Sequence, residues 1–186
     1  QSFRVIDNSL YRLTQPENSE NGWLAGFEVG INKRLSFLPG FLTRLGVDAN
    51  YTFTKSEMQV PNYATDDNGD IVITKSTEAL PNQSKHIFNA ALFYEKGKTM
   101  VRVAGNYKAA ALAVVQGNPE NYRWYDKNFT VDMSASYKIS KKITAFVEVN
   151  NLTNAPMRYY QGSANRPEQL EYYSIRGMAG VNINLF

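Results

Sequence analysis

The residue types that most often carry chemistry are sparse in this sequence. It contains no cysteine and a single histidine, His86, which excludes disulfide scaffolds and thiolate metal sites and argues against a His-cluster metal centre. No Ser or Cys partner can be placed beside His86, so nucleophilic catalysis has no support. Asp66, Asp67 and Asp70 surround Gly69 in a spacing faintly like a calcium loop, but the downstream bidentate Glu is missing and a turn is the better interpretation. We therefore predict no enzyme activity, no metal and no cofactor.

Aromatic and arginine residues in the polar segments offer a different chemistry, the binding of a ligand. An exposed aromatic ring can stack on a sugar or another ring, and a guanidinium can hold an anion. Each has a plainer alternative, because loop aromatics often pack a loop or lie at a membrane interface, and loop arginines are often solvated or brace a loop. The predicted ligand-binding residues are Trp124, Tyr125, Arg158, Tyr159, Tyr160 and Arg166.

The segments that would position these residues alternate between apolar and polar side chains with a period of two, which predicts β-strands. The clearest example is 129–139, where Val131, Met133 and Ala135 oppose Asp132 and Ser134. We expect about eight strands of roughly ten residues each, the length that a tilted strand needs to cross a bilayer. The predicted strands are 3–13 (the weakest), 23–37, 45–54, 86–95, 101–109, 129–139, 143–150 and 175–185.

Short and long links alternate between these strands. Lys96-Gly97-Lys98 and Ser140-Lys141-Lys142 predict tight turns, and 36–44, which contains Pro39-Gly40, predicts a medium turn with one helical turn. The other links are predicted to be long polar loops. They cover 14–22, 57–85, 114–127 and 152–173. A meander with short turns at one end and long loops at the other is the wiring of outer-membrane barrels.

Composition narrows the class of protein further. The formal net charge is +3, and without a concentrated basic patch it does not indicate a nucleic-acid partner. No apolar run approaches the roughly 18 residues of a membrane-spanning helix. Aromatic residues make up 13% of the chain, with 12 Tyr and 10 Phe, which favours strands.

Periodicity alone does not tell which face of such a sheet meets water, so a soluble antiparallel sandwich or lipocalin-like barrel stays open. Two observations favour a membrane barrel. Ions lie near the middle of the polar faces, where a water-filled lumen accepts them. The apolar faces are rich in Ala and Gly at mid-strand and carry Tyr or Phe towards strand ends, like an interfacial aromatic girdle. The ions are Asp48, Arg102, Asp132 and Glu148, and the girdle residues are Tyr51, Phe53, Tyr107 and Tyr137.

Several motifs resemble those of TonB-dependent outer-membrane receptors, and they follow one another in the same order as in that family. In the C-terminal part they are Asn150-Asn151-Leu152-Thr153-Asn154-Ala155-Pro156, Arg158-Tyr159-Tyr160, Gly162-Ser163, Asn165-Arg166-Pro167 and Glu171-Tyr172-Tyr173. Earlier ones are Pro16-Glu17-Asn18, Gly26-Phe27-Glu28, Leu38-Pro39-Gly40 and Asn50–Ser56. The resemblance implies an all-β antiparallel barrel of 22 strands with an N-terminal plug inside it. Residues 1–186 would then be the C-terminal portion of the barrel, about its last eight strands, without the plug and the N-terminal strands.

The terminal strand is also similar to the assembly signal of such barrels, formed here by Val181, Ile183, Leu185 and Phe186. Phe186 departs from the pattern because it falls on the opposite parity from Ile183 and Leu185. With the terminus in the periplasm, the short turns become periplasmic and the loops around Asp67, Tyr125 and Arg166 become extracellular.

The resemblance implies a receptor of the bacterial outer membrane for TonB-dependent uptake of a scarce nutrient, a siderophore, an oligosaccharide or a vitamin. The implied partners are outer-membrane lipid, the TonB complex through the missing plug, the barrel assembly machinery and a small-molecule or oligosaccharide ligand. Two alternatives stay open. One is a complete eight-stranded outer-membrane barrel with a structural or adhesion role, in which the strands near Phe3 and Val181 would pair. The other is a soluble carbohydrate-binding β-sandwich.

Overall fold

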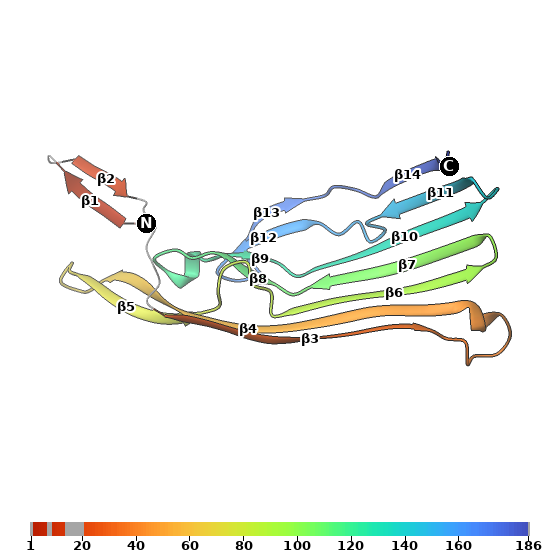
Figure 1. Ribbon diagram of the computed structural model, residues 1–186. Coiled ribbons are helices and arrows are strands. Elements are labelled where there is room, and N and C mark those ends of the chain that lie inside the picture. The colour runs from red at the N-terminus through yellow and green to blue at the C-terminus, as the bar shows by residue number, and fades with distance from the viewer. Residues whose placement is uncertain (1, 7–8, 14–20, 186) are drawn as a thin grey trace.

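The computed structural model describes residues 2–6, 9–13 and 21–185, which form strands and two short 3₁₀ helices (Figure 1). In the first half of the chain these are β1 (Ser2–Ile6), β2 (Ser9–Leu13), β3 (Gly22–Arg34), η1 (Gly40–Arg44), β4 (Leu45–Thr65), β5 (Ile71–Glu78) and β6 (His86–Lys96). In the second half they are β7 (Thr99–Lys108), β8 (Ala111–Val114), η2 (Pro119–Asn121), β9 (Arg123–Tyr125), β10 (Asn128–Lys138), β11 (Ile143–Asn150), β12 (Met157–Gln161), β13 (Pro167–Glu171) and β14 (Arg176–Ile183).

The main sheet is an antiparallel meander in which each strand pairs with the next long strand along the chain. Its order is β14-β11-β10-β7-β6-β4-β3, and β5 pairs with the far part of β4. Seven of the eight predicted strands lie in this sheet in the predicted order, so the all-β antiparallel fold is confirmed. The predicted turns at residues 36–44, 96–98 and 140–142 are confirmed and gather at one end of the sheet (Figure 1). The turn at 36–44 contains the single helical turn that its sequence predicts, η1.

The prediction of one strand over residues 3–13 was wrong. The described parts of this range form two strands, β1 and β2, that pair with each other as an antiparallel hairpin. The sequence between β1 and β2, Asp7-Asn8, lies outside the described residues. The predicted loop at 14–22 lies mainly outside the described residues.

Three of the predicted long polar loops contain strands that the sequence did not predict, and this is a second correction. The segment 57–85 contains the continuation of β4 and all of β5, 114–127 contains η2 and β9, and 152–173 contains β12 and β13. Pro61 in the extended β4 is unusual, because proline is rare inside sheets. It lies, however, where β5 is the only strand beside β4, so that the missing N–H interrupts a two-stranded ribbon and not the main sheet.

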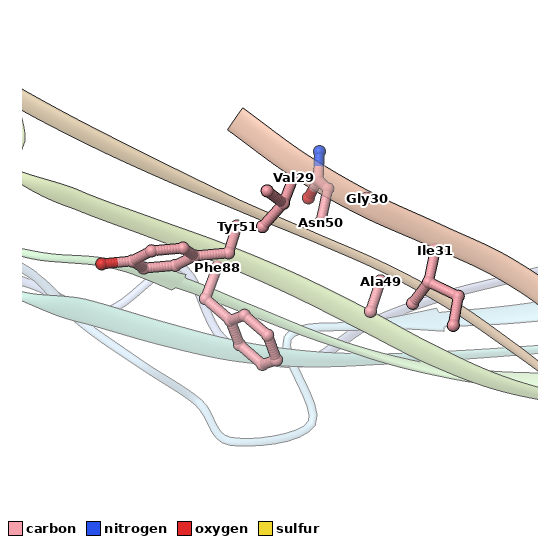
Figure 2. Close-up of a pocket in the computed structure, with 7 residues that line it drawn as sticks. All are labelled: Val29, Gly30, Ile31, Ala49, Asn50, Tyr51 and Phe88. Atoms are coloured by element: carbon pink, nitrogen blue, oxygen red, sulfur yellow. The ribbon is translucent and has the colours of Figure 1, made fainter. Parts of the chain in front are cut away.

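The register places apolar and polar side chains on opposite faces of the main sheet. On one face, here called the apolar face, Val29, Tyr51 and Phe88 are directly opposed across three strands. Figure 2 shows Phe88, Ala49 and Ile31 on one side of these strands and Asn50 pointing the other way. A shallow hollow lies on the apolar side at the small residue Ala49. On the other face, the polar face, Asp48, Arg102, Asp132 and Glu148 all share one side. The predicted division of the side chains is therefore confirmed.

No layer covers the apolar face within the described residues. Phe27, Ile31 and Val181 on this face are each more than half exposed, whereas a soluble sandwich would bury such a face against a second sheet. The arrangement thus contradicts the sandwich alternative. No helix in the described part of the chain is long and apolar enough to cross a membrane.

The two edge strands of the main sheet are β3 and β14. Across the described ranges, each has one hydrogen-bonded neighbour in the sheet, and β1 pairs with β2 and not with β14. The complete eight-stranded barrel required β1 and β14 to pair, and the described residues do not show this closure.

Candidate ligand-binding site

The four short strands β8, β9, β12 and β13 form a second sheet at the end of the main sheet opposite the short turns (Figure 1). We call it the loop sheet. In its register Tyr159 is opposite Tyr125, and Tyr160 is opposite Trp124. The two aromatic pairs that the sequence singled out are therefore cross-strand neighbours, although they lie far apart in the sequence.

The Trp124 and Tyr160 rings share one face of the loop sheet. Their planes are 7° apart, with centroids separated by 6.2 Å. Trp124 also packs against a small buried cluster, which we call the cap core. The cap core consists of Met58, Val60, Leu112 and Tyr122. Trp124 is thus partly used for packing, which was the plainer of its two interpretations.

The cap core connects the β4–β5 hairpin to the loop sheet. Leu112 is 0% exposed and Tyr122 is 2% exposed, although Tyr122 was expected in a long polar loop and Leu112 lies just before that loop. Tyr122 Oη donates a hydrogen bond to Asn62 Oδ1 at 3.0 Å, and the Asn82 amide donates to the Leu112 carbonyl at 2.6 Å. These contacts hold two long connections together, 57–85 and 109–127, and the pairing of β9 with β12 adds the third, 152–173, to one folded cap.

The opposite face of the loop sheet carries the second aromatic pair together with cations. The rings of Tyr125 and Tyr159 meet edge to face at 5.2 Å. The Arg123 guanidinium lies 4.0 Å from the Tyr159 ring centroid, and Lys108 Nζ lies 5.7 Å from that of Tyr125. Lys108 is the last residue of β7 on the polar face, so this side of the loop sheet adjoins the polar face.

Burial changes the ionisation of the aromatic residues in the loop sheet. It raises the pKa of the Tyr125 and Tyr160 phenols above the ordinary value of about 10. The Asp126 carboxylate raises the pKa of Tyr160 further. Both phenols are therefore neutral at physiological pH and present apolar rings that retain a hydrogen-bond donor.

The two arginines of the predicted site have partners within the loops. Arg158 donates to Asp126 Oδ2 at 2.7 Å and also to the Ala164 carbonyl. Arg166 donates to the Glu120 carbonyl and to Gln161 Oε1, both at 3.2 Å. Both guanidinium groups thus brace the loop sheet, and a role in ligand binding stays a prediction.

A row of amide side chains crosses the polar face of the main sheet. Asn50 Nδ2 donates to Glu28 Oε1 at 3.2 Å, and Asn89 Nδ2 donates to Asn50 Oδ1 at 2.8 Å. Asn106, directly opposite Asn89, donates from Nδ2 to Asp132 Oδ2 at 3.0 Å. Because each amide side chain can both donate and accept, the row forms a polar lining across the neighbouring strands from β3 to β10.

Sequence reasoning missed Arg123, Lys108 and this amide row. Arg123 could have been found, because the period of two places it on the same side as Tyr125. The amide row was hidden because Asn89 and Asn106 become neighbours only once strand pairing is known.

The acidic turn at residues 66–70 is held by hydrogen bonds of its own. Asp66 Oδ1 accepts hydrogen bonds from the amides of Asn68 and Asp70, both at 2.9 Å, and the interpretation as a turn is confirmed. In the described parts of the chain, no cluster of three His, Cys, Asp or Glu side chains could hold a metal ion. His86 lies on the apolar face, where Nδ1 is 2.8 Å from Tyr51 Oη.

The predicted assembly signal lies partly within β14. Val181 and Ile183 are exposed on the apolar face, and Leu185 is also exposed. Phe186 lies outside the described residues, so the signal stays a prediction.

A meander with one apolar exposed face, one polar face, short turns at one end and folded loops at the other defines the wall of a transmembrane β-barrel. The profile of a protein family described as "TonB dependent receptor-like, beta-barrel" matches residues 2–152. The chain belongs to this family, the β-barrel of TonB-dependent receptors. A search of the curated proteins and a search of the solved structures found no match to this chain.

Membership confirms the resemblance seen in the sequence and several predictions that followed from it. The family consists of non-enzymatic transporters of the bacterial outer membrane that act with TonB in the uptake of ligands. The chain is therefore a segment of a receptor barrel, and catalysis is not its function.

Proposed function

We propose that the folded cap captures a nutrient for TonB-dependent uptake, and that the Tyr125–Tyr159 face of the loop sheet is its first contact. The supporting observation is the combination of two neutral rings with Arg123 and Lys108 beside the polar face. Such a surface suits a ligand with flat apolar faces and polar or anionic groups. Siderophores, oligosaccharides and vitamins all fit this description. Trp124, Tyr160, Arg158 and Arg166 are proposed to complete or support the site.

The path beyond the cap is proposed to follow the polar face. The amide row from Asn50 to Asn106 can exchange hydrogen bonds with hydroxyl or carbonyl groups of a passing ligand. The barrel wall makes and breaks no covalent bond in this scheme. Movement would be driven by TonB acting on a plug domain outside this sequence, in keeping with the mechanism that the family resemblance implies.

The chain is further proposed to be the C-terminal part of a larger barrel. Unpaired backbone groups of a membrane strand cost several kcal/mol each in lipid, and within the described residues β3 and β14 each have one free edge. Further strands of the same barrel would pair with both edges.

Titration calorimetry on the purified receptor tests the capture site with three probes, a ferric catecholate siderophore, a linear glucose oligosaccharide and a cobalamin. Tyr125→Ala and Tyr159→Ala should each weaken binding of the probe that binds about tenfold or more, as for central aromatic contacts. Tyr172→Ala removes a tyrosine that is 59% exposed outside the loop sheet and should have little effect. Equal losses in all three variants, or none in the first two, would contradict the proposed site.

The orientation of the chain follows from the rule that outer-membrane barrels have short periplasmic turns and longer extracellular loops. Ser36 and Ser163 are both exposed and lie at opposite ends of the sheet. In intact cells, a membrane-impermeant maleimide should label Ser163→Cys, whereas it should label Ser36→Cys only after the outer membrane is permeabilised. The reverse pattern would overturn the orientation.

A further inference from the structure

The turn between β3 and β4 differs from the other short turns because its tip is apolar and exposed. Phe37 and Phe41 are 74% and 72% exposed, more than any other aromatic side chain whose exposure is described. The turn is nevertheless well formed. The Leu38 amide donates to the Leu35 carbonyl at 3.0 Å, and Thr43 Oγ1 donates to the Gly40 carbonyl at 2.9 Å. The two phenyl rings are thus presented on an ordered frame.

Basic side chains surround this tip and continue along the neighbouring turns. In residues 33–44, 95–98 and 138–142, eight side chains are basic and one is acidic, whereas the whole chain has 20 basic and 17 acidic residues. All eight are exposed. The only acid, Glu95, forms an ion pair with Arg34. We call this surface the basic rim, formed by Lys33, Arg34, Arg44, Lys96, Lys98, Lys138, Lys141 and Lys142.

The basic rim also adjoins a surface that contacts lipid in this family. Ile31 and Lys33 lie on the apolar face of β3, directly before the turn. An apolar tip in line with a lipid-facing surface and ringed by cations matches the chemistry of an interfacial anchor, in which aromatic rings enter the headgroup region and cations attract anionic lipids.

We propose that the β3–β4 turn and the basic rim bind anionic phospholipid headgroups of the periplasmic leaflet. Phe37 and Phe41 insert beside the acyl chains, and Lys33 and Arg44 contact the phosphates. The inference rests on the orientation in the proposed function, with the short turns in the periplasm. A phospholipid leaflet is favoured over a protein partner because the rim continues a lipid-facing surface and its cations are distributed over three separate turns.

Fluorescence quenching on the purified receptor tests the proposal. Trp23 and Trp124 are replaced by Phe, and a single reporter is introduced as Phe37→Trp, with Phe41→Trp as a second reporter should the first fail to fold. Vesicles contain equal parts of phosphatidylcholine and phosphatidylglycerol, with bromine on the chains of one lipid or the other. Brominated phosphatidylglycerol should quench the reporter more strongly than brominated phosphatidylcholine.

Two matched controls define the expected result. Phe88→Trp places the same reporter on the apolar face far from the rim and should show no preference between the lipids. Lys33→Gln with Arg44→Gln should reduce the preference of the Phe37→Trp reporter about fivefold for each cation removed, whereas Lys85→Gln with Lys127→Gln, at the other end of the sheet, should leave it unchanged. High salt should weaken the preference because exposed charges are screened.

Three outcomes would overturn the proposal. Equal quenching by both lipids would show that the rim does not select anionic headgroups. Absence of quenching by either lipid would place the turn outside the bilayer, as expected for a protein-binding surface. Labelling of Ser36→Cys in intact cells would show that the orientation itself is wrong, which separates that failure from a failure of lipid binding.

Discussion

The cap core leads to a prediction about how the long loops are held. Leu112 is completely buried among Met58, Val60 and Tyr122. Leu112→Ala should destabilise the docking of the β4–β5 hairpin by about 2–5 kcal/mol, from lost apolar burial and the cavity that remains. At about 1.4 kcal/mol for each factor of ten, even the lower value raises the population of the open cap about 30-fold.

Hydrogen exchange provides the assay, because one amide reports the docking directly. The Asn82 amide donates to the Leu112 carbonyl and should exchange about 30-fold faster or more once the cap opens, in the receptor held in detergent or membrane. Amides of β10, in the middle of the main sheet, should keep their protection because the substitution leaves that sheet paired. Leu170→Ala is the matched control, since Leu170 lies in the loop sheet but is 51% exposed.

The reasoning would be refuted by either of two results. If Leu112→Ala and Leu170→Ala accelerated exchange at Asn82 equally, burial in the cap core would not be the cause. If Leu112→Ala also exposed the amides of β10, the cap and the main sheet would be one cooperative unit.

Two other predictions concern the loop sheet. At Gly162, φ is +67° and an added Cβ would lie 2.4 Å from the Glu120 carbonyl oxygen, so Gly162→Ala should weaken binding of whichever ligand the calorimetry identifies. Gly69 also has a positive φ, +88°, but open space around it. The control Gly69→Ala therefore isolates the cost of the backbone angle and should leave binding unchanged. Burial raises the pKa of Tyr160, so its contribution to stability is fully present below the unfolded pKa of about 10 and is lost as the pH rises through the folded pKa. Denaturant titrations in alkaline buffer should therefore show a steeper loss of stability in the native protein than in Tyr160→Phe, and parallel curves would contradict this.

The membrane strands could be predicted from the sequence because lipid and lumen impose opposite demands on alternate residues. In β10 and β11 the apolar and polar positions alternate along most of each strand, and the short polar links between strands are equally visible. The meander follows from these two signals, since consecutive antiparallel strands joined by tight turns must be neighbours.

The folded cap could not be predicted in the same way. Its strands are short, between three and five residues for β8, β9, β12 and β13, too short for a period to be recognised. The meeting of Tyr125 with Tyr159 depends on a register set by contacts far apart in the sequence. Residue type alone indicated that these rings were available for binding, but not that Arg123 and Lys108 would lie over them.

Strand β4 extends from the membrane-facing part of the main sheet into the folded cap, and its residue pattern changes between the two. From Leu45 to Phe53 the odd-numbered residues of β4 are apolar and face outward, over about the nine residues that a tilted strand needs to cross a bilayer. At Lys55 and Glu57, which form an ion pair at 2.8 Å, the same face becomes charged. The buried apolar residues then change parity, because Met58 and Val60, only 8% and 5% exposed, point into the cap core. Since an ion pair on the lipid side is costly, we expect the membrane surface to cross β4 between Phe53 and Lys55.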